Sequence, residues 1–557
     1  MSRTLLPPSQ AFRPRQLLLR AAVMTVVSAL LLAMVGFWRH DDAVLAAGVN
    51  PPTPGNFTGY GFDQCTTPSQ ASMDAWLAHS QYLGVGVYIS GVDRGCPSQP
   101  NLTPEWVSTQ LANGWHILPI DVGPQAACYQ STSSTKKVRI STAKNAGGGF
   151  GQAIKQAKAD ADDAVAAALA LGIRPKSTIY YDIEAYDTTK GPCNNSALAF
   201  LSAWTNEIHA QGYKSGVYSS ALAAIRALDR ARKNNPGRYT MPDHLWIADW
   251  DGLVNTESSH YAIDPTAWVP HARIKQYRGG HNETHGGVTI NIDNDYLNVG
   301  HGTLPGRESH CGGVPINFPD YLVLSKPSQG HKLNANQKAQ VKALKCLLKE
   351  RGTFTAKPAN ARWGKSLVRA INDWKTAHPE VPSQPGVWNR PLWMSIFAAG
   401  PALNGTSTRY LKYGSGGSPV RDLQRALNAA IPGIDQKVDG LFYAVTTSTL
   451  KTYEKQVGIK AEGIVSPTVW EALAAGRLTE PSPPTTCPTP SPTISVSPTA
   501  SITSSTSPSI SPTASTSPQP PTTCPTTSPT VTTTTPAAKK PAAKHATKTK
   551  KTAAKKR

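Results

Sequence analysis

The sequence predicts an α/β protein built on a (β/α)8 TIM-type barrel, and three observations point to this fold. Eight β-like runs occur between residues 57 and 303, and helical segments separate several of them. The span is close to the roughly 250 residues of a typical barrel. An open, doubly wound sheet is the alternative for any β/α alternation, but no glycine-rich dinucleotide fingerprint follows the first run. The eight runs therefore favour the barrel.

The strand candidates are short and rich in β-branched and aromatic residues. They cover residues 59–63, 85–90, 115–123, 178–184, 214–220, 244–250, 273–277 and 288–293. The clearest helix is the amphipathic segment 151–173, which Gly172 and Pro175 close. A second helix is expected over 195–211. We expect helical crossovers between the strands, as in other (β/α)8 barrels.

The N-terminal segment 1–50 is expected to be a signal peptide or a signal anchor. Residues Ala21–Trp38 carry no charge, and arginines without acids precede them. The chain should then be secreted or membrane-anchored, and extracytoplasmic; the resemblances given below add an association with the cell wall. Eight cysteines fit such an oxidising compartment, although their pairing cannot be deduced from the sequence.

An internal repeat follows the barrel. The second copy, 408–476, is the cleaner one, and the first copy, 320–400, is degenerate. Residues 386–393 (GVWNRPLW) match residues 463–470 (GIVSPTVW), with the same spacing from glycine to tryptophan. We therefore expect two small all-α modules in tandem.

The C-terminal part differs in composition from the rest. Residues 480–538 are almost all Pro, Ser and Thr, which predicts a disordered stalk. Residues 539–557 hold nine Lys or Arg residues and no acid, and they supply much of the net charge of +21. Anionic wall polymers or lipid head groups are the expected partners of this cationic tail, and nucleic acid is unlikely.

Acidic residues end several of the predicted strands. Asp182 and Glu184 stand two apart in YYDIEAYD (180–187), so on a strand they share one face and, in a barrel, point to the interior. Two adjacent carboxylates repel, which raises the proton affinity of one. Glycoside hydrolysis needs such a pair, one protonated and one charged. The alternative interpretation of a single D-x-E motif is that the two acids lie on an exposed strand face or form salt bridges with arginines, without a catalytic role.

Further side chains are expected at the same mouth. Asp63, Asp293 and Asp295 are the other candidate catalytic acids, and Asp121 also follows a strand. The candidate substrate contacts are aromatic rings on which sugars could stack, together with one more acid. They are Tyr180, Tyr218, Trp246, Asp249, Trp250 and Tyr277. The sequence contains no C-x-x-C or H-E-x-x-H motif, so we expect no metal and no cofactor.

Residues 57–300 resemble the glycoside-hydrolase-like barrel of exported actinobacterial envelope proteins, which is similar to glycoside hydrolase family 25 muramidases. The resemblance rests on GFDQC (61–65), YYDIEAYD, GVYSS (216–220), LWIADWDG (245–252), IKQY (274–277) and IDNDYL (292–297). It implies Glu184 as general acid, Asp182 as stabiliser of the charged intermediate and Asp63 as a positioning or pKa-tuning group. It also implies Asp293 or Asp295 as the acid near the eighth strand.

The second repeat copy resembles the peptidoglycan-binding domain of bacterial wall hydrolases. The matching positions are Leu411, Gly414, Ser415, Val420, Leu423, Gln424, Val438, Asp439, Gly440, Phe442, Gly463, Val465, Pro467 and Trp470. The two resemblances imply an exported, muramidase-like hydrolase acting on peptidoglycan. The alternative is a catalytically inactive barrel that binds envelope glycan as a structural or regulatory wall protein.

Overall fold

The computed structural model describes residues 50–129, 138–260, 262–357, 360–399, 410–434 and 436–478, which belong to one compact unit. The expected signal segment, stalk and cationic tail lie outside these residues, apart from residue 50, and remain predictions. Within the described ranges, no helix is both long enough and apolar enough to cross a membrane.

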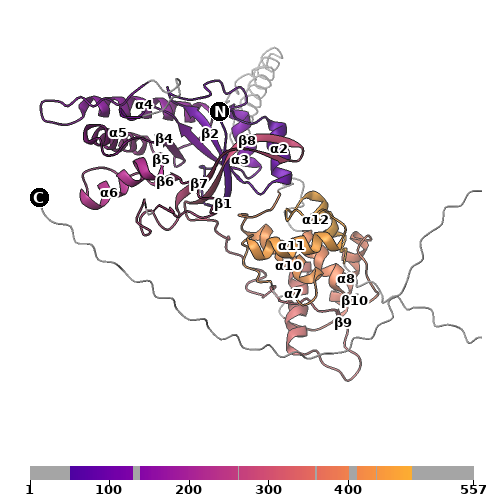
Figure 1. The fold of residues 1–557 in the computed structure, drawn as a ribbon. Coiled ribbons are helices and arrows are strands. Elements are labelled where there is room, and N and C mark those ends of the chain that lie inside the picture. The colour runs from indigo at the N-terminus through magenta and orange to yellow at the C-terminus, as the bar shows by residue number, and fades with distance from the viewer. Residues whose placement is uncertain are drawn as a thin grey trace, which may run out of the picture. The chain divides into compact units, whose positions relative to one another are not determined.

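Eight strands close into one barrel in chain order, which confirms the predicted α/β, TIM-type fold (Figure 1). The first seven strands are parallel to their neighbours along the chain. The strands are β1 (Phe57–Asp63), β2 (Gly84–Ser90), β3 (His116–Asp121), β4 (Thr178–Asp182), β5 (Lys214–Ser220), β6 (His244–Ala248), β7 (Ala272–His285) and β8 (Val288–Val299).

Helices connect the first six strands around the outside of the barrel. They are α2 (Gln70–His79), α3 (Pro104–Ala112), α4 (Gly151–Ala170), α5 (Gly191–Ala210), the π-helical turn η1 (Ala221–Ile225) and α6 (Arg226–Asn234). The buried face of α4 is mostly alanine, which lets the helix pack closely, and α4 and α5 lie side by side (Figure 1). The two predicted helices thus exist, with ends shifted by a few residues.

The expected helical crossovers are wrong for the last two connections. The described part of the β6–β7 connection contains no helix, and β7 and β8 form a hairpin. Gly286 and Gly287 make its turn with φ of 58° and 79°, as a two-residue hairpin loop requires. Such a turn leaves no room for a helix, so β8 runs antiparallel to both β7 and β1.

The β7–β8 hairpin bends and packs against α2. Register shifts between residues 276 and 281 bend it. The indole Nε1 of Trp76 donates to the carbonyl of Val288, and the Trp76 and His285 rings lie 4.8 Å apart. The tip of the hairpin therefore lies against helix α2.

The repeat forms two copies of a three-helix pattern. The first copy contains α7 (Ala335–Glu350), α8 (Lys365–Ala377) and α9 (Arg390–Ala398), with a small sheet of β9 (Leu324–Ser325) and β10 (Val387–Trp388). The second contains α10 (Ser418–Ala430), α11 (Ala444–Gln456) and α12 (Pro467–Ala474). Both copies contribute to one hydrophobic core, since α9 packs against α10 and α12.

The matching motif of the two copies encodes the start of the third helix. Gly386 and Gly463 adopt positive φ of 71° and 74°. Three residues later, Asn389 and Ser466 cap α9 and α12 by accepting a backbone N–H of the first turn, where each helix also has a proline. The two copies of the repeat thus share a glycine turn, an N-cap and the spacing of their apolar residues.

Candidate active site

Four carboxylates line one cavity at the mouth of the barrel. The cavity has a volume of about 340 Å³, and its lining includes Asp63, Asp182, Glu184 and Asp293. Asp63 and Asp182 are the last residues of β1 and β4, so they lie at the strand ends where a barrel of this type presents its chemistry. The structure thus brings together four of the five candidate catalytic acids.

The antiparallel direction of β8 sets which of its acids reaches the cavity. Asp63 and Asp293 are partners in the β1–β8 ladder, so their Cβ atoms are neighbours, about 5 Å apart. Asp295 pairs with Gly61, one layer deeper in the barrel, where it is fully buried. It accepts a 2.8 Å hydrogen bond from the indole Nε1 of Trp246. Asp293, and not Asp295, therefore lines the cavity.

Burial and repulsion keep protons in this group of acids. Asp63 is 3% exposed, and its burial, together with the nearby Asp293, raises its pKa to about 7. Burial also raises the pKa of Asp293 to about 6; the charge of His281 opposes this shift, and Glu184 adds to it. Acids with pKa values near neutrality can gain or lose a proton at physiological pH.

The sequence predicts that Asp182 and Glu184 share one strand face, but in the structure they do not. Strand β4 ends at Asp182, and Glu184 lies in the loop that follows. The buried side chain of Gln125 fixes this turn: its Oε1 accepts a 2.8 Å bond from the Glu184 backbone, and its Nε2 donates 2.9 Å to the Asp182 carbonyl. Asp182 is buried and Glu184 half-buried, and both still line the cavity.

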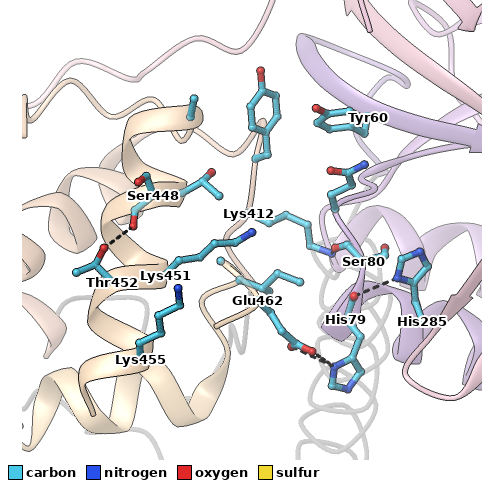
Figure 2. Close-up of a pocket in the computed structure, with 16 residues that line it drawn as sticks. Tyr60, His79, Ser80, His285, Lys412, Ser448, Lys451, Thr452, Lys455 and Glu462 are labelled. Atoms are coloured by element: carbon cyan, nitrogen blue, oxygen red, sulfur yellow. Dashed lines mark hydrogen bonds and ion pairs between the residues drawn. The ribbon is translucent and has the colours of Figure 1, made fainter. Parts of the chain in front are cut away.

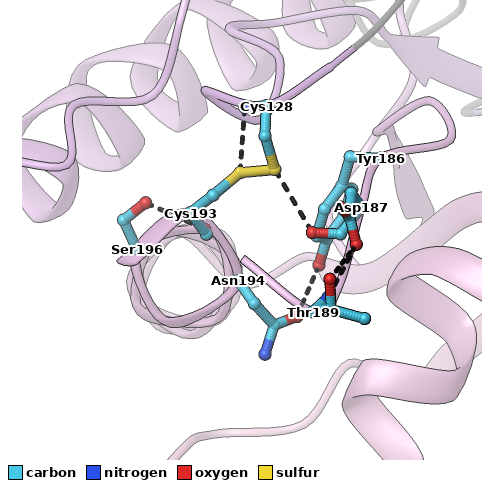
Figure 3. The surroundings of a disulfide bond; sticks show 7 residues. All are labelled: Cys128, Tyr186, Asp187, Thr189, Cys193, Asn194 and Ser196. Carbon is cyan, nitrogen blue, oxygen red and sulfur yellow. Dashed lines mark hydrogen bonds between the residues drawn. A yellow bond between two sulfur atoms is a disulfide. The ribbon is translucent and has the colours of Figure 1, made fainter. Parts of the chain in front are cut away.

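A disulfide holds the loop that carries Glu184. Cys128, in the loop after β3, is bonded to Cys193 in the first turn of α5 (Figure 3). Beside it, Tyr129 and Tyr186 form an antiparallel bridge between the two loops. The backbone around Glu184 is thus fixed on both sides, which places its carboxyl at one edge of the cavity.

Two further disulfides occur among the described cysteines. Cys65–Cys96 joins the end of β1 to the loop after β2, and both residues line the cavity. Cys311–Cys346 joins the segment after the barrel to α7. Glu350 lies near this second pair, and the three form the one group of possible metal ligands in the described residues. Because both sulfurs are oxidised, that group is a poor metal site.

One amide side chain, Gln276, connects the acids to the aromatic rim. Its Nε2 donates to Asp63 Oδ2 at 2.8 Å and to Asp293 Oδ2 at 3.2 Å. Its Oε1 accepts from the Tyr218 hydroxyl at 3.0 Å and from the Trp250 Nε1 at 2.9 Å. Gln276 is 1% exposed, so its position is fixed by these four partners.

Neither Gln276 nor Gln125 is among the site residues that the sequence predicts. Gln276 lies two residues after Ile274 on β7 and shares its interior face. An amide there is costly to bury without partners, and that cost is a signal the sequence did contain. Gln125 lies in a loop without periodicity, so no pattern distinguishes it.

Trp250 forms a fixed aromatic surface at the rim. Its side chain is exposed, and the indole lies over Gly279, where an added Cβ would be 2.6 Å from Cη2. Tyr218 is half-buried beside it. Neither residue lines the cavity itself, but both donate to Gln276, which contacts the cavity acids Asp63 and Asp293.

Tyr180 and Trp246 lie below the cavity, inside the barrel. Both are at most 1% exposed. Tyr180 donates or accepts a 3.0 Å hydrogen bond with His244 Nδ1, and its ring fills the space left by Gly216, where a Cβ would be 2.2 Å away. Neither ring has a face open to a sugar, so the predicted substrate contact does not fit this structure.

Asp249 and Tyr277 also differ from the expectation. Asp249 is buried and accepts hydrogen bonds from Ser258 and Ser259, with His260 2.9 Å away. These contacts hold the loop after β6, and Asp249 is not among the residues that line the cavity. Tyr277 is only 8% exposed and is not part of that wall.

Comparison with known proteins agrees with this architecture. Residues 74–297 match the model of the Rv2525c-like, glycoside hydrolase-like domain. The barrel is thus similar to the glycoside hydrolase-like domain of Rv2525c-like proteins. Residues 416–473 match the peptidoglycan binding domain family. A glycoside hydrolase-like barrel joined to such a domain indicates a function on cell-wall glycan, which lies outside the cytoplasmic membrane.

Several solved structures are similar to this part of the chain. An uncharacterized B. stearothermophilus protein is 18% identical, with 43% of this chain and 95% of that chain covered and a TM-score of 0.26. The Mycobacterium tuberculosis Tat-secreted protein Rv2525c is 15% identical, with 43% of this chain and 95% of that chain covered and a TM-score of 0.29. The Streptococcus pneumoniae autolysin LytC is 13% identical, with 43% of this chain and 46% of that chain covered and a TM-score of 0.27. No curated protein matches the sequence significantly.

Proposed function

We propose that the chain is an exported, muramidase-like glycoside hydrolase that cleaves a glycosidic bond of peptidoglycan. The observation that carries this proposal is the set of four carboxylates around one cavity, two of which have pKa values raised toward neutrality. A glycosidase needs one carboxyl to donate a proton and another to remain charged. The peptidoglycan binding domain supports the choice of substrate.

In this proposal, Glu184 protonates the leaving oxygen. Its half-buried side chain lines the cavity from a loop that Gln125 fixes. Asp182, buried at the end of β4, faces the positive charge that develops on the sugar ring. Protons held by Asp63 and Asp293 near neutral pH reduce the repulsion that four charged acids would otherwise create.

Trp250 offers the sugar a surface outside the catalytic group. Its exposed indole lies beside Gln276, and an aromatic face suits the apolar face of a pyranose ring. The same glutamine contacts Asp63 and Asp293, so a sugar held by the indole would have a fixed relation to the acids.

The proposal also includes where the protein acts, which the two terminal segments would determine. Residues 1–50 would direct export, as the uncharged run Ala21–Trp38 after the arginines supports. Residues 539–557 would bind anionic wall polymers or lipid head groups through their nine cationic side chains.

The test is Glu184→Gln, which keeps the shape of the side chain and removes the proton it can give. The variant should release soluble reducing ends from purified peptidoglycan about 10²–10⁴-fold more slowly, and it should co-sediment with the wall as wild type does. Glu207→Gln is the matched control, since Glu207 pairs with Lys158 outside the cavity. Equal rates for wild type and Glu184→Gln would exclude Glu184 as the acid. A wild-type chain that binds the wall and releases nothing would favour the inactive, glycan-binding alternative.

A further inference from the structure

A second cleft lies between the barrel and the peptidoglycan binding domain (Figure 2). Its volume is about 670 Å³. The barrel side includes His79 and Gln81, from the end of α2 and the loop before β2, and the other side includes Ser448, Lys451 and Lys455 on α11. We call this space the interdomain cleft.

The two lysines give the interdomain cleft a positive wall. Lys451 and Lys455 are exposed, one turn apart on α11, and extend toward the barrel side (Figure 2). Among the described residues, no carboxylate forms an ion pair with either ammonium. The acid in the lining, Glu462, already contacts Lys460 at 2.7 Å and His79 at 3.3 Å. The cleft therefore has cationic charge available for a ligand.

The positive wall is supported by the local backbone. Gly463 lies under the stem of Lys451, and an added Cβ there would be 2.8 Å from the lysine Cε. Gly463 also needs its positive φ of 74° for the turn before α12. Because Gly463 has no side chain, the methylene groups of Lys451 can pack against its backbone, while the ammonium stays in the cleft.

Lys412 fixes the two walls relative to one another. Lys412 comes from the second repeat copy, yet the residue is only 1% exposed, and its ammonium contacts the end of helix α2 in the barrel. It donates to the carbonyls of Ser80, at 2.8 Å, and of Leu77. At the other end of the cleft, the rings of Tyr60 and Tyr413 meet at 5.0 Å. The interdomain cleft is therefore preformed, which lowers the cost of binding.

We propose that the interdomain cleft binds the carboxylates of peptidoglycan stem peptides. This inference rests on the wall-binding half of the proposed function. The backbone sugars of peptidoglycan carry no charge once their lactyl groups are joined to peptides, so its anionic groups lie in the peptides. Lys451 and Lys455 would pair with these carboxylates, hydroxyls such as that of Ser448 would bind peptide amides, and Gln81 would bind from the barrel side.

The experiment is a calorimetric titration of the whole chain carrying Glu184→Gln, which keeps the glycan intact. The probe is a soluble disaccharide tetrapeptide with free carboxylates, compared with the same compound amidated. Lys451→Gln with Lys455→Gln should weaken binding of the free acid about tenfold or more, and amidation should have a similar effect. Lys437→Gln is the control, because Lys437 is exposed on the same domain and lies outside the cleft.

A barrel-side variant tests whether the cleft is shared by the two domains. Gln81→Glu should weaken binding of the free acid several-fold, and Gln81→Lys should strengthen it. Equal affinities for the two probes, or no effect of the lysine substitutions, would overturn the proposal. Binding of polyglycerol phosphate in place of the peptide would also overturn it. Because the titration does not depend on turnover, its failure is distinct from a failure of the hydrolase assignment.

Discussion

Asp63 and Asp293 at the mouth resemble Asp121 and Asp160 elsewhere in the barrel in the direction of their pKa shifts, which is upward for all four carboxyls. Burial is the main cause in both pairs. The first pair lines a cavity and contacts the amide of Gln276, whereas the second is enclosed between β3 and α4. A raised pKa alone therefore does not mark a catalytic acid, and an open cavity must accompany it.

The enclosed pair has local partners only. The Ser90 hydroxyl donates a 2.6 Å bond to Asp121, and Gly123 packs so closely on Asp160 that an added Cβ would be 2.5 Å from Oδ1. Burial and the neighbouring Asp121 raise the pKa of Asp160 well above its usual range, so the two carboxyls can share a proton. Asp121, which the sequence suggested for the mouth, faces the helix layer because its neighbour Ile120 faces the barrel interior.

The largest expected difference between the pairs is in activity. Asp63→Asn should lower the release of reducing ends about 10²-fold or more, because it removes a proton-holding acid from the cavity. Asp160→Asn should leave the rate near that of wild type, since asparagine can still donate to Asp121. Reducing-end assays of both variants, with circular dichroism to confirm folding, measure this. Equal losses would show that the two pairs act alike.

Gln276→Leu should have an intermediate effect. The leucine has a similar volume and cannot donate to Asp63, whose pKa the amide lowers, so that pKa should rise further. We expect activity to fall about 10- to 100-fold and the limb of the pH–rate profile that depends on Asp63 to move to higher pH. Tyr218→Phe, which removes only one donor to Gln276, should shift the profile less. A profile that keeps its midpoints would limit Gln276 to packing.

The last expected difference is in the pH dependence of stability, which does not involve the activity. A buried carboxyl with a raised pKa binds its proton more tightly in the folded state, so it stabilises the fold below its unfolded pKa of about 4, and this contribution falls as pH rises. Wild type should therefore lose stability between pH 5 and 8 by up to about 1.4 kcal/mol per pH unit more than Asp160→Asn. Urea unfolding of both proteins across this range measures the difference. Parallel curves would show that Asp160 is already ionised in the folded chain.

The strand count and the main helices could be read from the sequence because each buried strand has a distinct apolar run. The direction of β8 was also readable, since Gly286 and Gly287 are a hairpin signal, but the barrel pattern suggested a crossover instead. Period-two alternation placed Asp182 correctly and failed at Glu184, where the strand has ended.

Other parts of the site depend on contacts between distant segments. Gln125 reaches Glu184 across 59 residues, and Cys128 pairs with Cys193 across 65. No local pattern encodes such pairings. Alternation also could not separate the mouth from the layer below it, which is why Trp246 was expected to meet a sugar although it is buried.

Lys412 has a consequence for how this protein can be divided or recombined. The carbonyls at the end of α2 are satisfied by a side chain more than 330 positions later in the chain. A barrel cut after residue 303 would lose this cap, and water would have to replace the lysine as the donor to these carbonyls. Exchange of the C-terminal domain with another protein would keep these contacts only if the incoming domain carries a donor at the position of Lys412.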